Sequence, residues 1–130
     1  MALAGRNASF SLGSNEVASL ASITNDITGD TLDTTVFGVD FKTFIAGLRG
    51  GTITISGFYD STDTAGQVAM RTAILAGTLL TTTQKPVFSV DGTNGFTADG
   101  IISSMSTGAE VAGLVSFSAT IQLSGTIAVV

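Results

Sequence analysis

Two short segments hold the acidic side chains that could serve in catalysis or metal binding. The first, Asp60-Ser61-Thr62-Asp63, could be a carboxylate pair or part of a calcium loop. A calcium loop needs more oxygen ligands and a closing bidentate Glu, and none follows. Side-chain oxygens and negative charge instead suit the first turn of a helix, where backbone N–H groups lack partners. We therefore interpret this segment as the start of a helix.

The second segment holds Asp30 and Asp33, which could form an acid–base dyad of the kind that cleaves glycosides. Sugar-binding surfaces need aromatic platforms, but the chain has no tryptophan and one tyrosine, Tyr59. It also has no histidine and no cysteine, which excludes a Ser–His–Asp triad, a Cys nucleophile and thiolate or imidazole metal ligands. The sequence thus predicts two solvated loop residues here. It predicts no enzyme, catalytic residue, metal or cofactor.

Phosphate and nucleic-acid binding have no support in the basic and glycine-rich residues. Gly47-Leu48-Arg49-Gly50-Gly51 lacks the Gly-Lys-Ser/Thr ending of a phosphate-binding loop and leads into a strand rather than a helix. The basic residues are scattered singly and make no patch for a polyanion: Arg6, Lys42, Arg49, Arg71 and Lys85.

The composition favours a subunit of an assembly. A chain of 130 residues is expected to form a single domain, residues 1–130. Hydrophobic residues make up 44% of it and charged residues only 12%, about half the usual charged share. Ser, Thr and Gly must coat much of the surface, or other subunits must cover it. The N-terminus has no apolar run of signal-peptide length, which predicts synthesis in the cytosol.

The C-terminal segment shows the clearest strand pattern. Residues 111–130 are uncharged and could be mistaken for a membrane span. However, apolar Val115, Phe117, Ala119, Ile121 and Leu123 alternate with polar Ser116, Ser118, Thr120, Gln122 and Ser124. This period of two predicts a strand with one wet face and one dry face. We expect Val115, Phe117, Ile121 and Leu123 to pack under the helix.

The other elements follow from the same signals. Strands are predicted at Arg6–Leu12, Glu16–Ile27, Thr52–Phe58, Val87–Asp91 and Phe96–Met105, with hairpin turns at Gly13-Ser14-Asn15 and Gly92–Gly95. One short helix, about 64–76, is predicted from a capping box of Thr64 and Gln67 and a stop at Gly77. About six or seven strands flanked by this helix make a mainly β fold, an antiparallel sandwich or barrel.

Residues 28–51 break the strand pattern and are predicted as a long loop. Phe37, Phe41 and Phe44 fall within eight residues of it, which argues against disorder. An extended loop or a long hairpin that docks onto an apolar surface, such as a neighbouring subunit, fits this composition better.

Three segments of the chain resemble the major tail protein family of long-tailed phages. They are Asp33-Thr34-Thr35-Val36-Phe37-Gly38, Ile45-Ala46-Gly47-Leu48-Arg49 and Thr52-Ile53-Thr54-Ile55-Ser56-Gly57-Phe58-Tyr59-Asp60, matching a "D-x-T-x-F-G … I-x-G-L" loop and an "I-S-I-S-G-x-x-D" strand before a short helix. Leu123-Ser124-Gly125-Thr126-Ile127 is similar to the close of the family's last strand. The resemblance covers nearly the whole chain.

The resemblance implies a β-sandwich or half-barrel subunit of a tail tube. Six subunits would form a ring whose inner sheets join into a barrel, and rings would stack through the long loop and the terminal segments. Double-stranded DNA would pass through the lumen without specific binding, and tail terminator, tape measure and distal tail proteins would be partners. The location would be the virion tail, assembled in the host cytoplasm without membrane insertion of the subunit. Gene transfer agents, contractile injection devices and type VI secretion tubes use related subunits.

Within that picture we assign two surfaces. The inter-ring interface is predicted at Asp33, Phe37, Phe41, Phe44 and Leu48, since buried aromatics usually carry most interface energy. The lumen-facing residues are predicted to be Ser116, Ser118, Thr120 and Gln122. The alternatives are a virion decoration subunit or a pilin-like adhesion subunit, which would need a donor strand or an exposed adhesion loop.

Overall fold

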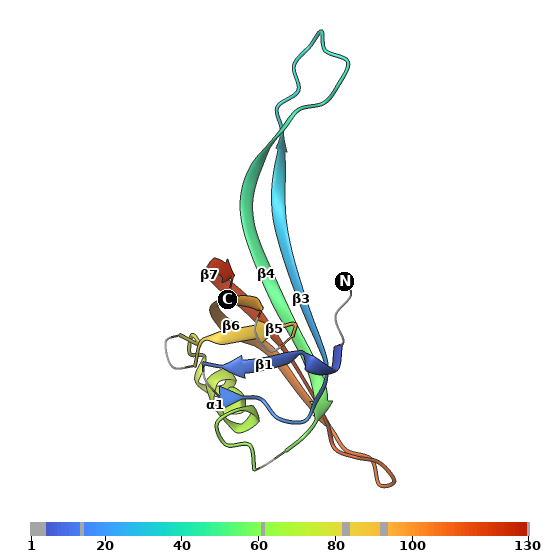
Figure 1. Ribbon diagram of the computed structural model, residues 1–130, viewed down its shortest axis with the longest axis vertical. Coiled ribbons are helices and arrows are strands. Elements are labelled where there is room, and N and C mark those ends of the chain that lie inside the picture. The colour runs from blue at the N-terminus through green and yellow to red at the C-terminus, as the bar shows by residue number, and fades with distance from the viewer. Residues whose placement is uncertain (1–4, 14, 61, 82–83, 92–93, 130) are drawn as a thin grey trace.

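A computed structural model describes residues 5–13, 15–60, 62–81, 84–91 and 94–129 (Figure 1). The elements, in chain order, are a short 3-10 helix η1 (Gly5–Asn7), strands β1 (Ser9–Leu12), β2 (Asn15–Glu16), β3 (Leu20–Asp33) and β4 (Phe44–Phe58), helix α1 (Gln67–Ala76), and strands β5 (Pro86–Ser89), β6 (Gly95–Gly108) and β7 (Ser116–Val129). The prediction of a mainly β fold with one short helix is confirmed. No helix in the described part of the chain has the length and apolar character that crossing a membrane requires.

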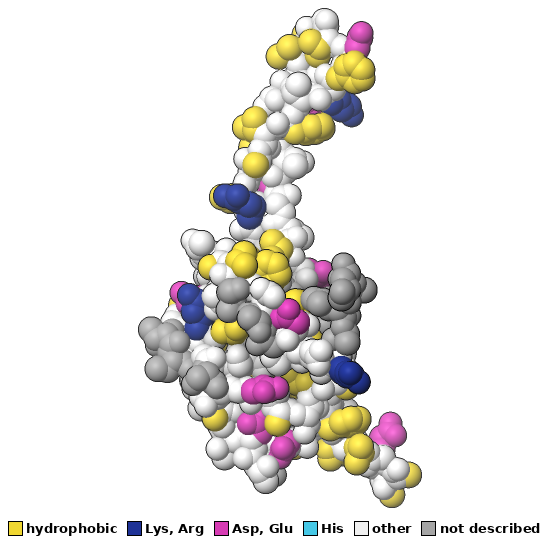
Figure 2. Space-filling model, viewed as in Figure 1, with side chains coloured by type: hydrophobic (Ala, Val, Ile, Leu, Met, Phe, Trp, Pro, Cys, Tyr) yellow, Lys and Arg dark blue, Asp and Glu magenta, His cyan; other side chains and the backbone are white. Residues whose placement is uncertain are grey.

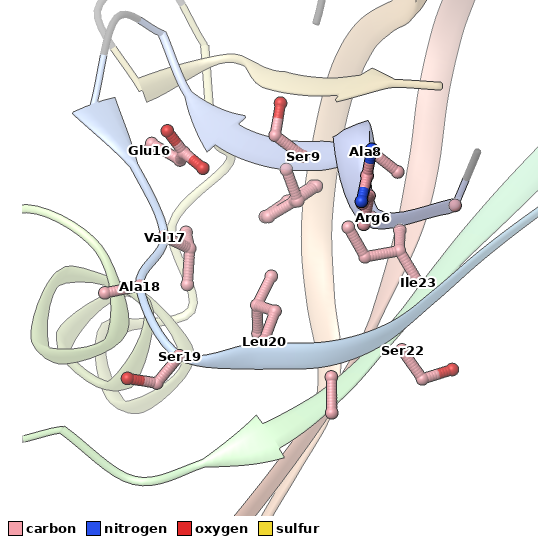
Figure 3. Close-up of a pocket in the computed structure, with 13 residues that line it drawn as sticks. Arg6, Ala8, Ser9, Glu16, Val17, Ala18, Ser19, Leu20, Ser22 and Ile23 are labelled. Carbon is pink, nitrogen blue, oxygen red and sulfur yellow. The ribbon is translucent and has the colours of Figure 1, made fainter. Parts of the chain in front are cut away.

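All the strands belong to one sheet. Its order is β2-β1-β5-β6-β7-β4-β3, and every neighbouring pair is antiparallel. The sheet curves until β1, close to one edge, approaches β3 at the other edge (Figures 1 and 3). Of the two architectures expected, this single curved sheet corresponds to the half-barrel.

The core lies between the curved sheet and α1. It holds Phe10 and Leu12 from β1, Ile53 and Ile55 from β4, Phe117, Ala119, Ile121 and Leu123 from β7, and Met70 and Ala73 from α1. The alternation predicted for β7 is confirmed in this strand, because the polar residues between its buried members are exposed or half-buried. Val115 is the exception: it is 42% exposed. It precedes β7, in the turn that projects past the end of the core, so the prediction that it packs under the helix was wrong.

The predicted long loop at 28–51 is mostly a β-hairpin. β3 continues to Asp33 and β4 resumes at Phe44, so only residues 34–43 lie outside the strands. The pair runs from Leu20↔Gly57 to Asp33↔Phe44, with register shifts between Leu20 and Ser22 and between Gly29 and Thr31. The alternation is lost here because both faces of the hairpin beyond the core are exposed, so neither face needs to be apolar.

Glycines in this hairpin, which resemble loop punctuation in the sequence, permit close approach between the two strands. A Cβ on Gly47 would lie 3.0 Å from Asp30 Cβ, and one on Gly51 would lie 2.9 Å from the Asp26 carbonyl oxygen. These glycines therefore permit the pairing of the two strands and do not end them.

Two N-terminal strands differ from the prediction, the first by starting later and the second by being interrupted. In the segment Arg6–Leu12, residues 5–7 form η1 and the strand begins at Ser9. In Glu16–Ile27, Ser19 has a φ of 62°, and this left-handed residue separates β2 from β3. The predicted hairpins join β1 to β2 and β5 to β6, while Ser14, Gly92 and Thr93 of their turns lie outside the described residues.

Helix α1 begins at Gln67 and lacks the predicted capping box. Asp63, not Thr64, accepts the hydrogen bond from the Gln67 backbone N–H at 3.2 Å, and it also accepts one from the Ala18 N–H at 2.9 Å. The C-terminal stop is as predicted: Gly77 is left-handed, and the N–H groups of Gly77 and Thr78 return to the last turn.

The Gln67 side chain ties α1 to the sheet. It is fully buried, its Oε1 accepts from the Asp60 N–H at 2.7 Å, and its Nε2 donates to the carbonyls of Ala18 (2.8 Å) and Phe58 (2.9 Å). One side chain thereby satisfies backbone groups before β3, at the end of β4 and before the helix. In a capping box the Gln67 side chain would bond only within the first turn of the helix, whereas here it connects segments that are distant in the sequence.

We predict that Gln67→Ala lowers the free energy of unfolding by about 3 kcal/mol, because it leaves three partly buried backbone groups without this partner. The measurement is urea denaturation of the dilute protein, followed by circular dichroism. Leu75→Ala, on the same helix but with a side chain 83% exposed, is the matched control and should change stability by less than about 0.5 kcal/mol. Equal effects of the two variants would contradict the role of Gln67.

Candidate functional surfaces

The four long strands present a face of hydroxyl groups on the side of the sheet opposite the core. Cross-strand pairing aligns their side chains in three rows: Ser22, Ser56, Ser118 and Ser106; Thr24, Thr54, Thr120 and Ser104; and Asp26, Thr52, Gln122 and Ile101. Each is exposed or half-buried. We call this set the hydroxyl face. Because directly paired residues project to the same side, the rows form a continuous polar surface across β3, β4, β7 and β6.

The hydroxyl face is nearly uncharged. Asp26 carries the one charge in these rows, and the other polar members are hydroxyls and the amide of Gln122. The Gln122 Nε2 donates to the Gly51 carbonyl at 3.1 Å, which fixes this longer side chain against the neighbouring strand. Such a surface holds water and offers no cluster of positive charge that would retain a polyanion.

The structure places all four residues predicted to face a lumen, Ser116, Ser118, Thr120 and Gln122, on this side of β7. Sequence reasoning named residues of β7 only. The contributions of β3, β4 and β6 were missed, although the alternation of Thr52, Thr54 and Ser56 in the sequence already pointed to a similar polar face.

The second surface is the apolar tip of the β3–β4 hairpin, which stands well away from the rest of the molecule (Figures 1 and 2). Phe37 and Leu48 are 106% and 85% exposed, Phe41 is 84% exposed and Phe44 is 53% exposed. We call the three phenylalanines the apolar tip; Leu48 lies four residues past Phe44, farther along β4 toward the base of the hairpin. None of them belongs to the core, so the structure brings the predicted interface residues together on one projection.

Threonines close the neck of this projection. The Thr34 N–H donates to the Thr43 carbonyl at 2.8 Å, and the two hydroxyl oxygens lie 3.0 Å apart. The Thr43 N–H in turn donates to the Thr35 hydroxyl at 3.0 Å. These bonds hold the ends of the loop together without any apolar core beneath it.

Asp33 shapes the first turn of the loop. Its Oδ1 accepts from the Thr35 N–H at 2.8 Å. Hydrogen bonding from the Thr35 side chain, and then from its backbone N–H, holds the pKa of Asp33 below its ordinary value. Asp33 is fully exposed beyond this contact, so its charge stabilises a local turn and remains at the surface.

A third exposed apolar group was not predicted. Val111 and Leu114 in the β6–β7 turn are 110% and 70% exposed, at the end of the molecule opposite the apolar tip (Figure 1). A sequence signal for this exposed group was present, because residues 111–115 lie in a turn and contain no charged side chain.

The two larger cavities bordered by described residues are lined by scattered polar and apolar side chains. One of about 570 Å³ lies between η1, β1 and β3, with Arg6, Glu16 and apolar Val17, Leu20 and Ile23 around it (Figure 3). Among the described residues, no three acidic side chains gather where they could hold a metal ion. The features that stand out are therefore surfaces for contact: one polar face, two apolar projections and the sheet edges between them.

This architecture is the tail tube fold. Solved structures of tails and tubes match it over nearly the whole chain. A chain from the tail of an empty gene transfer agent particle, determined by helical refinement with C6 symmetry, superimposes with a TM-score of 0.85 at 18% identity, over 99% of both chains. A chain of the SPP1 tail tube matches with a TM-score of 0.76 at 15% identity, over 98% of this chain and 78% of that one. A chain from the sheath–tube complex of an extracellular contractile injection system matches with a TM-score of 0.71 at 14% identity, over 99% and 91%. No protein-family model and no curated protein sequence matches the chain.

We predict that the triple variant Phe37→Ser, Phe41→Ser and Phe44→Ser keeps the urea midpoint of the wild-type monomer, because none of the three rings is part of the core. Circular dichroism during urea titration provides the measurement. The control is Phe117→Ser, which replaces a side chain only 1% exposed and should cost about 3–5 kcal/mol or prevent folding. A large loss of stability in the triple variant would place the phenylalanines in the folding core.

The Asp33 turn should respond to acid. Because the pKa of Asp33 is lowered in the folded chain, its contribution is complete above the ordinary carboxyl pKa and is lost as the pH falls through the lowered value. We predict that the amide resonance of Thr35 shifts with a midpoint below the ordinary pKa of an aspartate side chain. NMR of the monomer over an acid titration measures this. Asp33→Ala should abolish the transition and Asp40→Ala, in the same loop, should retain it; a midpoint at or above the ordinary value would contradict the assignment.

Proposed function

We propose that this protein is the structural subunit of a phage-type tail tube and is not an enzyme. Six copies form a ring, the rings stack into a hollow cylinder, and double-stranded DNA passes along the lumen from the capsid to the host. The observation that carries the proposal is the part of the sheet formed by β6, β7, β4 and β3, which has one hydroxyl face and two long free edges, within a fold shared with tail and tube structures.

The free edges support closure into a ring. In the described part of the chain, β3 pairs only with β4, and residues 101–108 of β6 pair only with β7. An exposed strand edge offers unpaired N–H and C=O groups to another strand. Because β6, β7, β4 and β3 alternate in direction, β3 of one copy and β6 of the next would also meet antiparallel. Pairing at this seam would join the sheets of successive copies into one barrel and leave no edge.

The hydroxyl face supports assignment of the lumen. If the sheets close with this face inward, the channel is lined by water-binding hydroxyls and the Asp26 carboxylates. Each copy also carries a net charge of −5, so the tube repels rather than retains DNA. Ser116, Ser118, Thr120 and Gln122, together with the matching residues of β3, β4 and β6, would line this channel.

The apolar tip supports stacking of rings. Exposed aromatic side chains on a projecting hairpin are a liability in a monomer, and an adjacent subunit would cover them. We assign Phe37, Phe41, Phe44 and Leu48 to the contact with the next ring, with Asp33 holding the loop in shape. Tail terminator, tape measure and distal tail proteins are the partners we propose for the tube ends and interior.

A tail that conducts DNA is favoured over an injection-system tube. The chain and the gene transfer agent tail chain cover 99% of each other at a TM-score of 0.85, against 0.71 for the injection-system chain. A decoration or pilin-like adhesion subunit remains the alternative outcome of the test below.

Electron microscopy of the purified protein over a range of concentrations, with size-exclusion chromatography, tests the proposal. Hollow cylinders of uniform width are expected for the wild type, and folded monomers for the triple Phe→Ser variant. A wild-type monomer at every concentration, also in the presence of a tail-tip extract as initiator, would overturn the tube assignment in favour of a decoration subunit.

The lumen assignment has its own prediction. Because the chain lacks cysteine, Thr54→Cys introduces a single thiol on the hydroxyl face. A maleimide attached to a polymer too large for the channel should label this thiol in the monomer and not in assembled tubes. Leu75→Cys, on α1, is the control and should be labelled in both. Equal labelling of Thr54→Cys before and after assembly would place the hydroxyl face on the outside.

A further inference from the structure

The β6–β7 turn is a second adhesive projection, at the pole opposite the apolar tip (Figure 1). Val111 is fully exposed there and Leu114 is mostly exposed, and the turn is held by a hydrogen bond from the Gly113 N–H to the Glu110 carbonyl at 3.2 Å. Glu110 is exposed beside them and provides the acidic charge of the turn. The projection therefore combines two apolar side chains with one carboxylate.

A groove with complementary character lies at the base of the β3–β4 hairpin. It has a volume of about 560 Å³ and is lined by Ile27, Leu48, Arg49, Phe96, Ile127 and Val129. Arg49 supplies a positive charge among these apolar side chains. Its stem crosses the paired strand at Gly29, where a Cβ would lie only 3.3 Å from Arg49 Cγ. The absence of a side chain at Gly29 thus leaves space for Arg49 at this position. We call this site the basal groove.

The charged side chains of the two surfaces, Arg49 and Glu110, form no ion pair among the described residues of the subunit. In the described part of the chain, the ion pair is Lys85 with Asp99, and neither Arg49 nor Glu110 takes part in one. Part of the apolar lining of the groove is also exposed to solvent: Val129 is 79% exposed and Ile27 is 45% exposed. The β6–β7 turn and the basal groove therefore both expose apolar side chains and carry opposite charges. They lie too far apart on one chain to contact each other.

We propose that the β6–β7 turn of one copy docks in the basal groove of a copy in the adjacent ring, with Glu110 against Arg49. This inference rests on the proposed function, since it requires rings that stack. A turn at one end and a groove nearer the other end make a head-to-tail contact, which repeats without closing and so extends a filament. Val111 and Leu114 would fill the apolar groove, and the ion pair would fix the rotation of one ring on the next.

The contact differs from that of the apolar tip in its position and in its chemistry. The tip extends far beyond the basal groove, so a ring seated on the groove can also be held along its side by the hairpin. Two separate contacts on each subunit would define both the spacing and the twist between rings.

A charge exchange tests the ion pair. Arg49→Glu and Glu110→Arg, each alone, place like charges together and should raise the protein concentration needed for tubes. The double variant restores opposite charges and should polymerise close to the wild-type concentration. Arg71→Glu, on exposed α1, is the control for a change of net charge. Each variant is first checked for a native circular dichroism spectrum as a monomer. A double variant as defective as either single variant, or single variants that polymerise normally, would overturn the pairing.

Cross-linking tests the contact independently of charge. Val111→Cys combined with Val129→Cys, in a chain that has no other cysteine, should give a ladder of disulfide-linked chains when assembled tubes are oxidised. Each single variant should give no ladder, and Val111→Cys with Leu75→Cys should give none. Tubes without a ladder and without charge rescue would overturn this docking and leave the tube function standing. A wild-type protein that never forms tubes would overturn the function and the docking together.

Discussion

The register of four long antiparallel strands is the constraint on which the rest of the molecule depends. In β3, β4, β7 and β6 a shift of one residue would exchange the faces of the sheet and place Ser118 and Thr120 in the core. The apolar alternation of Ile53, Ile55, Phe117 and Ile121 prevents that shift, because each must remain under α1 and β1. The same alternation orders the hydroxyl residues on the other face. The core and the proposed channel surface are thus two consequences of one register.

Beyond the core, the hairpin is maintained by backbone pairing and by hydroxyl groups. Its strands pair with each other up to Asp33 and Phe44, and Thr34, Thr35 and Thr43 close the loop. A two-stranded ribbon without a packed face has marginal stability in water. Its exposed phenylalanines contribute nothing to the isolated subunit. They acquire a stabilising role only where another surface covers them, which is consistent with a segment built for assembly.

The sequence predicts the fold well where one face of an element is buried. β7 and the second half of β4 have a clear period of two, a hairpin turn signal separates β5 from β6, and Gly77 marks the end of α1, so these elements were identified near their true bounds. The hairpin was described as a loop because its strands are exposed on both faces and lack alternation. Its glycines are typical of turns in a sequence, but in this hairpin they permit close contact between β3 and β4. The Gln67 network was also hidden, since its partners at Ala18 and Phe58 are distant in sequence.

The candidate surfaces show the same division. The four residues on β7 could be predicted because one strand carries its own pattern. The rows that continue into β3, β4 and β6 depend on which strands are neighbours, and that order is not contained in any single segment. The exposure of Val111 and Leu114 is likewise a property of the whole molecule. Whether the apolar side chains of a turn are buried or exposed depends on where the core lies relative to that turn.

The low charge content follows from the directions in which such a subunit would be contacted. Copies beside it would cover the edges of β3 and β6, and copies above and below would cover the apolar tip, the basal groove and the β6–β7 turn. The face toward a channel needs water-binding groups more than charge. Only the outer side then requires charge for solubility, and charged residues are 12% of the chain. Isolated charges such as Arg49 and Glu110, placed beside apolar residues at contact sites, become determinants of orientation. With few competing charges on the surface, a single ion pair can distinguish one rotation of a ring from another.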